Sequence, residues 1–552
     1  MKNSALLLSS IIAILTFSCG TEEKSAPTPK GMVSSAHPLA TQAGLDVLEA
    51  GGNAFDAFIA VASTLNVTEP MMSGLGGYGT ILIYDAKEKQ VRYLNSSGRI
   101  PINTNSDLMR PPTADYLENR TGAKAVSTPS NLHAWEAMHQ QYGTQQWSAL
   151  FKKAIQLAEE GFVISPQLSE FIAMSASDFS AYTNSFYTKD GVPLMTGDTL
   201  VQRDLGESFR RIASEGASAF YDGKIADAIE QVMVEREGFL RKVDLQQDTA
   251  EWWEPIVYDY KGYQVYTASV PSNAFAAFTF LGLMEQFKDQ AFEHNSEDYL
   301  HLLAEIAKQS YSSRLLYSVD PELDPFPGDK IFSADHLQAI VKSIDLASAS
   351  IYELPFVVPG SNNTTHFVVA DGAGNIVSAT QTLGNLFGSR IMPEGTGIWL
   401  NNSLAYCTYE PKGNPMDAKP GHHKLSGDCP VIIIKDGLPW AALGSPGGHT
   451  ITQNVPQIIF NLIDFEMTME QAITSPKISF AEPNSLIVES TVPQEIQNAL
   501  KERGHSITNR NIGNAHGIRI FRNQQGEIDR FEGSADLRGE GTAKSLSQKK
   551  SN

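Results

Sequence analysis

Two hairpin signals in the C-terminal half of the sequence place the strongest limit on how this chain can fold. The runs THFVVA and NIVSAT are rich in β-branched and apolar residues, and they flank Asp371-Gly372-Ala373-Gly374. The runs PVIIIK and PWAALG flank a second turn, Asp436-Gly437-Leu438. Aspartate followed by glycine between two such runs is typical of a tight β-hairpin. The chain is therefore expected to contain antiparallel sheet in two separate places.

Helical segments precede and follow these hairpins. The stretch between His37 and Pro70 predicts two helices separated by Gly51-Gly52, with Asn53 as the N-cap of the second. The second helix is apolar on nearly every side, which indicates deep burial. Residues from about 130 to 350 also show mostly helical spacing. Helices combined with two sets of hairpins predict strands sandwiched between helical layers.

The N-terminus predicts an export signal. Residues 1–19 contain one lysine, a short apolar run and then Ser18-Cys19, and the run is too short to span a bilayer. A small residue before a lone cysteine resembles the bacterial lipoprotein signal, so Cys19 is expected to be acylated and to anchor the protein to a membrane. Ordinary secretion with a chance Cys19 is the alternative. Residues 20–30 then form a polar linker, and a polar tail over 543–552 is expected to be disordered.

Composition excludes several classes of function. The chain of 552 residues carries 62 acidic and 42 basic side chains, and this net charge of −20 argues against nucleic-acid binding. Beyond Cys19 there are only Cys407 and Cys429, which either pair or remain as buried thiols. They lack the spacing of metal ligands, so neither a metal nor a cofactor is predicted. The glycine-rich run GLGGYG precedes a strand-like segment instead of following one, so a dinucleotide loop is rejected.

Thr364 is a candidate nucleophile at the first residue of a predicted strand. If the first hairpin turns symmetrically about Ala373, Thr364 lies opposite Thr382; a four-residue loop would instead bring Gln381 there. A threonine hydroxyl is a weak nucleophile without a base. One economical base is the α-amino group of the same threonine, whose ordinary pKa is about 7.7–8.0. This solution requires cleavage of the chain between Asn363 and Thr364.

Gly447 and Gly448 are candidates for the stabilisation of developing negative charge. They lie in the run LGSPGGHTITQ, between a strand-like segment and the start of a helix. Residues without side chains let backbone N–H groups converge on an oxyanion. Gly447-Gly448 alone would be an ordinary tight turn, and Thr364-Thr365 alone would be an ordinary strand start. The combination indicates catalysis.

Several motifs together resemble the γ-glutamyltranspeptidase family. They are SNNTTHFVVADGAGNIVSATQTL, GIWLNNSL and GSPGGHTI in the C-terminal part, and GMVSSAHPLATQAGLDVLEAGGNAFDA, EPMMSGLGGYG, YGTQQWSALFKKAIQLAEEGF and GASAFYDGKIADAI before it. The similarity runs from about Gly31 to Gly541. It implies an α+β fold, the four-layer αββα sandwich of the N-terminal nucleophile hydrolases. It also implies a precursor that cleaves itself into a large subunit, 31–363, and a small subunit, 364–552, which remain together as a heterodimer.

The resemblance implies specific catalytic roles. Thr364 matches the nucleophile and new N-terminus, and Thr382 matches the threonine that positions it. Gly447 and Gly448 match the oxyanion hole. In turnover, Thr364 would attack a substrate amide, and the acyl group would pass to water or to an acceptor amine.

The substrate pocket departs from the family pattern. The family binds the glutamyl α-carboxylate with an arginine in a stretch that reads NSSGRIP here, so that Ser97 or Gly98 stands near that place and Arg99 is displaced. Where the family has two adjacent serines that help to bind this carboxylate, this chain has Ser426-Gly427 and keeps one hydroxyl. The positions that normally hold the α-ammonium are Gly384, Ser403 and Tyr406, none of which carries a negative charge.

Three functions are therefore considered. The first is a γ-glutamyl hydrolase or transferase acting on glutathione and related small amides. The second is an acylase of other amides that lack a free α-amino group. The third is a non-enzymatic exported binding protein on the same fold. Retention of Thr364, Thr382 and Gly447-Gly448 favours the two enzymes.

Overall fold

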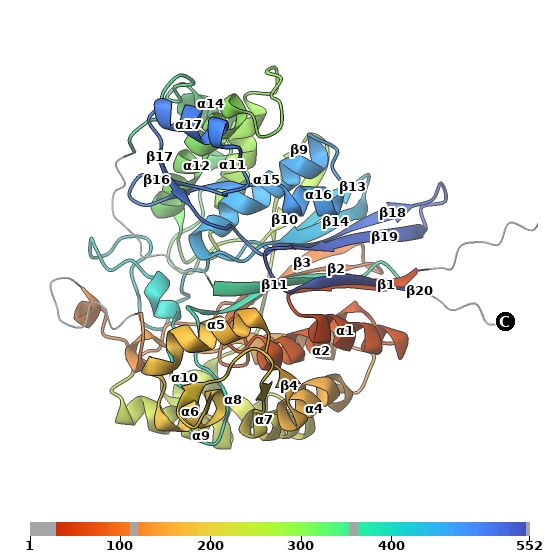
Figure 1. The fold of residues 1–552 in the computed structure, drawn as a ribbon, viewed down its shortest axis with the longest axis vertical. Coiled ribbons are helices and arrows are strands. Elements are labelled where there is room, and N and C mark those ends of the chain that lie inside the picture. Colours follow the sequence, from red (N-terminus) through yellow and green to blue (C-terminus); the bar gives the residue numbers. More distant parts are fainter. Residues whose placement is uncertain (1–28, 111–119, 353–362, 548–552) are drawn as a thin grey trace, which may run out of the picture.

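The computed structural model describes residues 29–110, 120–352 and 363–547. Two antiparallel sheets lie face to face, with helices on both outer sides, so the predicted αββα sandwich is the architecture of the chain (Figure 1). Helices α1 (Pro38–Glu49) and α2 (Ala54–Thr68) cover one sheet, and α11 (Phe275–Glu285) and α15 (Ile451–Ile463) cover the other.

The first sheet has seven strands, all antiparallel to their neighbours. In spatial order they are β20 (Thr542–Ser547), β1 (Pro29–Ser35), β11 (Asn363–Asp371), β12 (Ile376–Gly384), β2 (Tyr78–Asp85), β3 (Gln90–Ser96) and β8 (Glu251–Trp253).

The second sheet has six strands and is also antiparallel. Its order is β19 (Ile528–Ala535), β18 (His516–Arg522), β14 (Leu438–Gly444), β13 (Val431–Lys435), β10 (Tyr263–Thr267) and β9 (Ile256–Tyr260). Three small sheets contain β15 (Ile478–Ala481), β16 (Ser485–Val488) and β17 (Ser506–Asn509); β4 (Phe162–Val163) and β7 (Thr199–Leu200); and β5 (Thr188–Lys189) and β6 (Val192–Pro193).

The remaining helices thicken the two outer layers (Figure 1). On the side of α2 these are α3 (Asn131–Tyr142), α4 (Lys152–Glu160), α5 (Pro166–Ser175), α6 (Ala181–Tyr187), α7 (Arg203–Glu215), α8 (Ser218–Tyr221), α9 (Lys224–Glu235) and α10 (Lys242–Gln247). On the side of α11 these are α12 (Glu297–Tyr317), α13 (Gly328–Ile331), α14 (Ala334–Val341), α16 (Met469–Thr474) and α17 (Gln494–Glu502). Short 3₁₀ turns are η1 (Ser106–Met109), η3 (Ala123–Ala125), η4 (Trp147–Phe151), η5 (Ala176–Asp178), η6 (Ser403–Tyr406) and η7 (Gly448–Thr450).

Alternation along β11 separates two hydrophobic cores. Phe367 and Val369 face the helices and Phe367 stacks on Phe58 of α2, with ring centres 5.2 Å apart. Val368 and Ala370 face the second sheet. A strand whose both faces are buried reads as a continuous apolar run, which explains the sequence THFVVA.

The helix prediction near the N-terminus is confirmed. Asn53 caps α2 by accepting the N–H groups of Phe55 and Asp56, and the Asp56 carboxylate accepts the N–H of Asn53 in return. All residues of α2 are buried, as its apolar composition predicts.

The prediction of a disordered tail over 543–552 is wrong as far as Ser547. Thr542–Ser547 forms β20, which pairs with β1 and covers what would otherwise be a sheet edge. Its polar residues do not conflict with this position, because backbone hydrogen bonds to β1 hold the strand while Leu546 and Ala543 pack against the two hydrophobic cores. The predicted signal peptide and Cys19 lie outside the described residues. Within the described ranges, no helix has the length and apolarity needed to cross a membrane.

Candidate active site

The two threonines of the first hairpin lie together. Thr365 pairs with Gln381, as a turn symmetric about Ala373 requires, and the register shifts between Asn363 and Thr365. This irregularity lets the Thr364 hydroxyl donate to the Thr382 hydroxyl, with the two oxygens 3.4 Å apart. Both side chains are buried.

Thr382 also contacts the peptide bond ahead of Thr364. Its hydroxyl donates to the carbonyl oxygen of Asn363 at 2.7 Å and accepts the backbone N–H of Gly384 at 2.8 Å. A hydrogen bond to a carbonyl oxygen stabilises the negative charge that develops there when a nucleophile attacks its carbon. One hydroxyl therefore contacts both the candidate nucleophile and the carbonyl that it would attack.

The glycine pair lies at the same place. Gly447 and Gly448 follow β14 with φ angles of +136° and +59°, a backbone that disfavours other residues. Gly447, Asn363 and Thr364 line a common cavity of about 270 Å³. Its other walls include Thr450 and the segment 510–514. The structure thus brings a hydroxyl, an adjacent carbonyl and a glycine turn to one cavity.

Two ionisable side chains bond threonine hydroxyls of this hairpin, and Arg510 and Arg538 line the cavity at Thr364. His366 bonds the Thr380 hydroxyl at 2.8 Å, and burial lowers its pKa well below the ordinary value. Glu69 accepts the Thr365 hydroxyl at 2.9 Å on the helix side of the sheet. Burial raises the pKa of Glu69 to about 7, although the bond from Thr365 opposes this shift.

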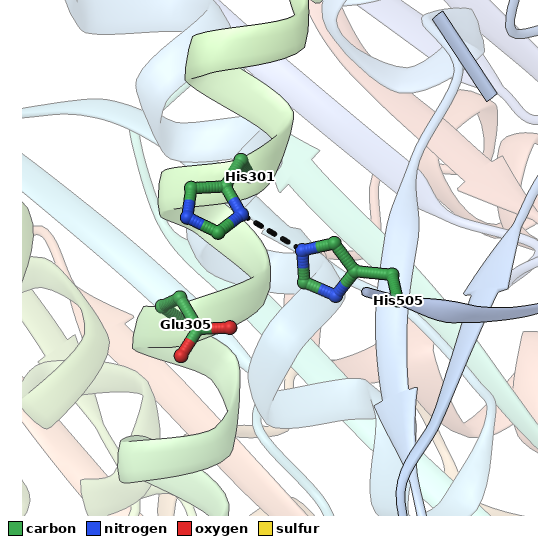
Figure 2. Close-up of side chains that lie close together, drawn as sticks. All are labelled: His301, Glu305 and His505. Atoms are coloured by element: carbon green, nitrogen blue, oxygen red, sulfur yellow. Dashed lines mark hydrogen bonds between the residues drawn. The ribbon is translucent and has the colours of Figure 1, made fainter. Parts of the chain in front are cut away.

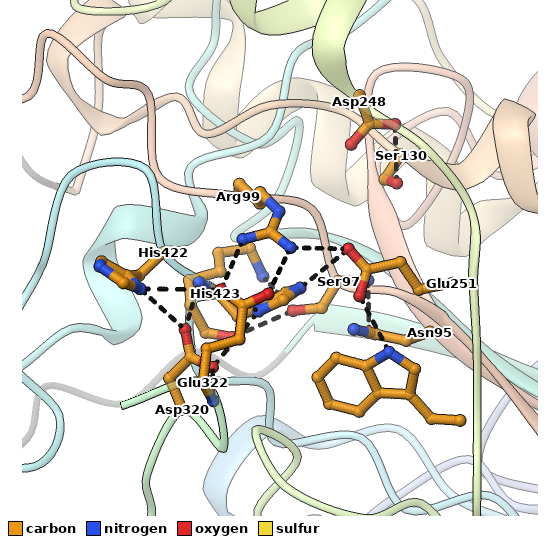
Figure 3. Close-up of polar contacts among 12 residues, drawn as sticks. Asn95, Ser97, Arg99, Ser130, Asp248, Glu251, Asp320, Glu322, His422 and His423 are labelled. Carbon is orange, nitrogen blue, oxygen red and sulfur yellow. Dashed lines mark hydrogen bonds and ion pairs between the residues drawn. The ribbon is translucent and has the colours of Figure 1, made fainter. Parts of the chain in front are cut away.

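Arg99 lies in a polar network of its own (Figure 3). Its guanidinium pairs with Glu322 at 2.7 Å and with Glu251 at 2.9 Å, and a third of the side chain is exposed. Glu251 also accepts from His423, which lies 3.1 Å away. Two carboxylates therefore already neutralise the guanidinium of Arg99.

The other predicted substrate residues are buried around the glycine turn and the hairpin. The Tyr406 ring lies edge-on to Tyr78 and to His449, with centres 6.4 and 5.6 Å away. The Ser403 hydroxyl bonds that of Ser127. Gly384, with φ of +100°, leaves no space for a larger side chain, because a Cβ would lie 2.0 Å from Asn402 Oδ1.

Ser426 and Gly427 lie in a segment that packs against the glycine turn at Gly448. The Ser426 hydroxyl accepts the N–H of Asp428 at 3.1 Å. A Cβ at Gly427 would lie 3.1 Å from the carbonyl oxygen of Gly448. Gly427 therefore leaves no room for a side chain next to the Gly448 carbonyl.

Lys424 and Asp428, which flank Ser426 and Gly427 in the sequence, were not predicted as site residues. Both are buried, and the ammonium nitrogen of Lys424 lies 3.2 Å from the centre of the Tyr78 ring and 3.4 Å from Ser97 Oγ. Burial lowers the pKa of Lys424 and raises that of Asp428, while each charge partly offsets the shift of the other. A buried lysine has no signature in a local sequence, so no pattern in HHKLSGD could have revealed it.

A second cluster of titratable groups lies far along the chain from the hairpin (Figure 2). His301, Glu305 and His505 have potential metal-ligand atoms within 4.8 Å of one another. However, the two histidines bond each other at 2.8 Å, and Glu305 accepts from Lys308 at 2.6 Å and from Ser350. Protein contacts therefore occupy both ring nitrogens of His301 and the Glu305 carboxylate, and they tie α12 to the segment near Ser350.

The two cysteines of the described chain are buried free thiols. Burial raises the pKa of each to about 12, so they remain protonated near neutral pH. The sequence left a disulfide and two buried thiols as alternatives, and the structure has two buried thiols.

Comparison with known proteins agrees with this geometry. A sequence profile of the Gamma-glutamyltranspeptidase family matches residues 40–546. The chain is 34% identical to a glutathione hydrolase proenzyme of Bacillus subtilis strain 168, over 94% of this chain and 92% of that protein. It is 32% identical to the acylase ACY 1 proenzyme of Pseudomonas sp. strain V22, over 90% of both chains. Among solved structures, a cephalosporin acylase from Bacillus halodurans superimposes with a TM-score of 0.86 at 26% identity, covering 97% of this chain and 99% of that one.

Proposed function

This chain belongs to the γ-glutamyltranspeptidase family, and we propose that it is a precursor that cleaves itself before Thr364 and then hydrolyses or transfers the acyl group of small amides. The observation that carries the proposal is the contact of Thr382 with both the Thr364 hydroxyl and the Asn363 carbonyl. A strand start in an ordinary hairpin has no need of this arrangement, so it favours an enzyme over a binding protein.

Self-cleavage would proceed by an acyl shift. The Thr364 hydroxyl oxygen attacks the Asn363 carbonyl carbon, the C–N bond breaks, and the hydroxyl proton passes to the Thr364 nitrogen. Water then hydrolyses the resulting ester and leaves Asn363 with a carboxylate and Thr364 with a free amino group. The hydroxyl of Thr382 stabilises the negative charge on the Asn363 oxygen in this step.

Turnover uses the new amino group as the base. It accepts the proton of the Thr364 hydroxyl while the oxygen attacks the substrate carbonyl, and it returns that proton to the leaving amine. The backbone N–H groups at Gly447 and Gly448 stabilise the oxyanion. Water or an acceptor amine then removes the acyl group from Thr364.

The acyl donor is a γ-glutamyl amide or a related amide. Glutathione hydrolase relatives favour the first reading, and acylase relatives of similar identity favour the second. Gly384, Ser403 and Tyr406 offer no carboxylate for an α-ammonium, which supports the acylase alternative. Assays with donors that differ only in their amino or carboxylate groups distinguish a γ-glutamyl enzyme from an acylase of other amides.

Replacement of Thr364 tests the proposal directly. The wild type should appear as two pieces that elute together in gel filtration, and Edman sequencing of the smaller one should begin Thr-Thr-His-Phe. Thr364→Ala should remain one inactive chain, whereas Thr364→Ser should still cleave, more slowly. A wild type that remains intact and releases no amine from any amide would support the binding-protein reading instead.

The proposal includes export with a lipid attached to Cys19. The motif Ser18-Cys19 after a short apolar run supports it. Metabolic labelling with a fatty-acid analogue should mark the wild type and leave Cys19→Ala unlabelled. Equal labelling of both proteins, or of neither, would contradict the lipid anchor.

A further inference from the structure

The peptide unit between Gly447 and Gly448 is one of the two that can present an N–H group to an oxyanion. In a trans peptide the C=O and the following N–H lie in one plane and point in opposite directions. Among the described residues, the N–H of Gly448 has no acceptor, whereas the Gly447 carbonyl accepts the N–H of Thr450 at 3.2 Å. Any group that fixes this carbonyl therefore also fixes the direction of an available N–H donor.

A side-chain hydroxyl binds the same carbonyl. Thr450 Oγ1 donates to the Gly447 oxygen, and the two atoms lie 3.0 Å apart. Thr450 is 7% exposed, and it lines the cavity of Thr364 together with Gly447. One residue of the cavity wall therefore supplies two donors to a single carbonyl, one from its backbone and one from its side chain.

Asn454, one turn further along α15, directs this hydroxyl. Its side chain is fully buried, and its Nδ2 donates to Thr450 Oγ1 at 3.1 Å. A threonine hydroxyl has one hydrogen to donate and can also accept. Because Oγ1 accepts from the amide, its own hydrogen is left for the Gly447 oxygen. The three residues thus form a chain of hydrogen bonds that ends at the glycine turn.

Ordinary helix capping does not account for this chain of bonds. Thr450 is the N-cap of α15, where a threonine usually accepts an N–H from the first turn of its helix. Within the described chain its side chain makes no such bond. Threonines near helices often donate to a carbonyl three or four residues earlier. Thr450 differs in that a buried amide supports its hydroxyl and that the carbonyl belongs to the proposed oxyanion turn.

We infer that Thr450 is a positioning residue for turnover: its hydroxyl, directed by Asn454, holds the peptide before Gly448 so that the N–H of Gly448 points at the substrate oxyanion. The inference rests on the proposed amide hydrolysis at Thr364. Oxyanion donors are effective because they are already oriented when the charge develops. A donor whose peptide is less firmly held loses part of this effect, although the N–H group itself remains.

Thr450→Val removes the hydroxyl and keeps the shape of the side chain. The turn should still form, because the backbone N–H of Thr450 remains bonded to Gly447. With γ-glutamyl and glutaryl para-nitroanilides as donors, kcat should fall by about 10-fold, the order of one hydrogen bond. KM should remain within about 2-fold of the wild type, because the oxyanion forms only in the transition state. Complete loss of an oxyanion donor costs more, about 10²–10³-fold.

Three further variants support this comparison. Thr450→Ser keeps the oxygen and should keep most of kcat. Asn454→Leu leaves the hydroxyl without its amide donor and should lower kcat less than Thr450→Val does. Thr452→Val removes another buried hydroxyl of α15 and should have the kcat of the wild type.

Self-cleavage is the readout that distinguishes positioning of the oxyanion donor from a general structural role. In that step the negative charge forms on Asn363, whose carbonyl oxygen accepts from Thr382. Thr450→Val should therefore cleave itself at the rate of the wild type, followed on a denaturing gel, while its turnover of anilides is slow. A general disturbance of the cavity would slow both reactions.

The possible outcomes separate this inference from the proposed function. An unchanged kcat in Thr450→Val, or equal slowing of its self-cleavage and turnover, overturns the inference while leaving the amide hydrolysis intact. If Thr450→Val does not fold, Asn454→Leu decides: a lower kcat with normal self-cleavage supports the inference, and any other result overturns it. A wild type that releases nitroaniline from neither donor would overturn the proposed function, and the inference with it.

Discussion

At the scale of single residues, the Thr382 hydroxyl makes three hydrogen bonds at the candidate active site. It accepts from Thr364 and from the N–H of Gly384, and it donates to the carbonyl of Asn363. Thr382→Val removes these bonds while preserving the shape of the side chain. Since the loss of one oxyanion donor typically slows a reaction by about 10²–10³-fold, we expect self-cleavage to slow by a similar factor. The intact fraction on a denaturing gel, followed over time, measures this rate.

Thr382→Ser is the matched control, because it keeps the oxygen. It should cleave much faster than Thr382→Val, although the loss of the methyl group leaves its hydroxyl less restricted. If Thr382→Val matures as fast as the wild type, the bond to the Asn363 carbonyl has no part in the cleavage.

At the scale of elements, β20 supports the strand next to the nucleophile. It pairs with β1, and β1 pairs in turn with β11, which begins at Asn363. Deletion of 542–552 exposes the edge of β1 and removes the backbone bonds between the two strands. We expect a lower melting temperature and slower self-cleavage, measured by calorimetry and by gel.

Deletion of 548–552 alone is the control for this truncation. It retains β20 and should leave both the melting temperature and the cleavage rate unchanged. Equal stability of the two truncated proteins would mean that β20 contributes nothing to the sheet.

Local sequence patterns predicted the helices and hairpins better than they predicted the contacts between elements that are distant in the sequence. The turn at Asp371-Gly372 fixed the hairpin, and its symmetry brought Thr364 to Thr382 because both lie within 19 residues of each other. Asn53 predicted the start of α2 for the same reason, because an N-cap contacts only the first turn of its helix. The pairing of β20 with β1 joins opposite ends of the chain, and the environment of Lys424 is built from β2 and the loop before β13. Such contacts depend on the complete fold, so a single sequence carries no direct sign of them.

At the scale of the whole molecule, the two proposed subunits are interleaved. In the first sheet, β1, β2, β3 and β8 precede Thr364, whereas β11, β12 and β20 contain or follow it. In the second sheet, β9 and β10 of the N-terminal part pair through β13 with strands of the C-terminal part. Cleavage before Thr364 therefore leaves the strand pairings in place except at Asn363, the first residue of β11, and the pieces are expected to separate only on unfolding.

The network around His423 joins the same two parts through charge (Figure 3). His423 of the C-terminal part contacts Glu251 and Asp320 of the N-terminal part, at 3.1 and 3.4 Å. Burial alone would lower the pKa of His423, but the bonds to Asp320 and Glu251 prevail and raise it to about 9. In the unfolded chain the pKa of a histidine is about 6.5.

This difference predicts how stability changes with pH. A pKa raised by folding stabilises the protein fully below about pH 6.5, and this contribution disappears as the pH rises toward 9. His423→Gln cannot be protonated, so its melting temperature should fall less between pH 6.5 and 9 than that of the wild type. His336→Gln, on α14 outside the network, should behave as the wild type does. Parallel curves for His423→Gln and the wild type would show that protonated His423 does not hold the two parts together.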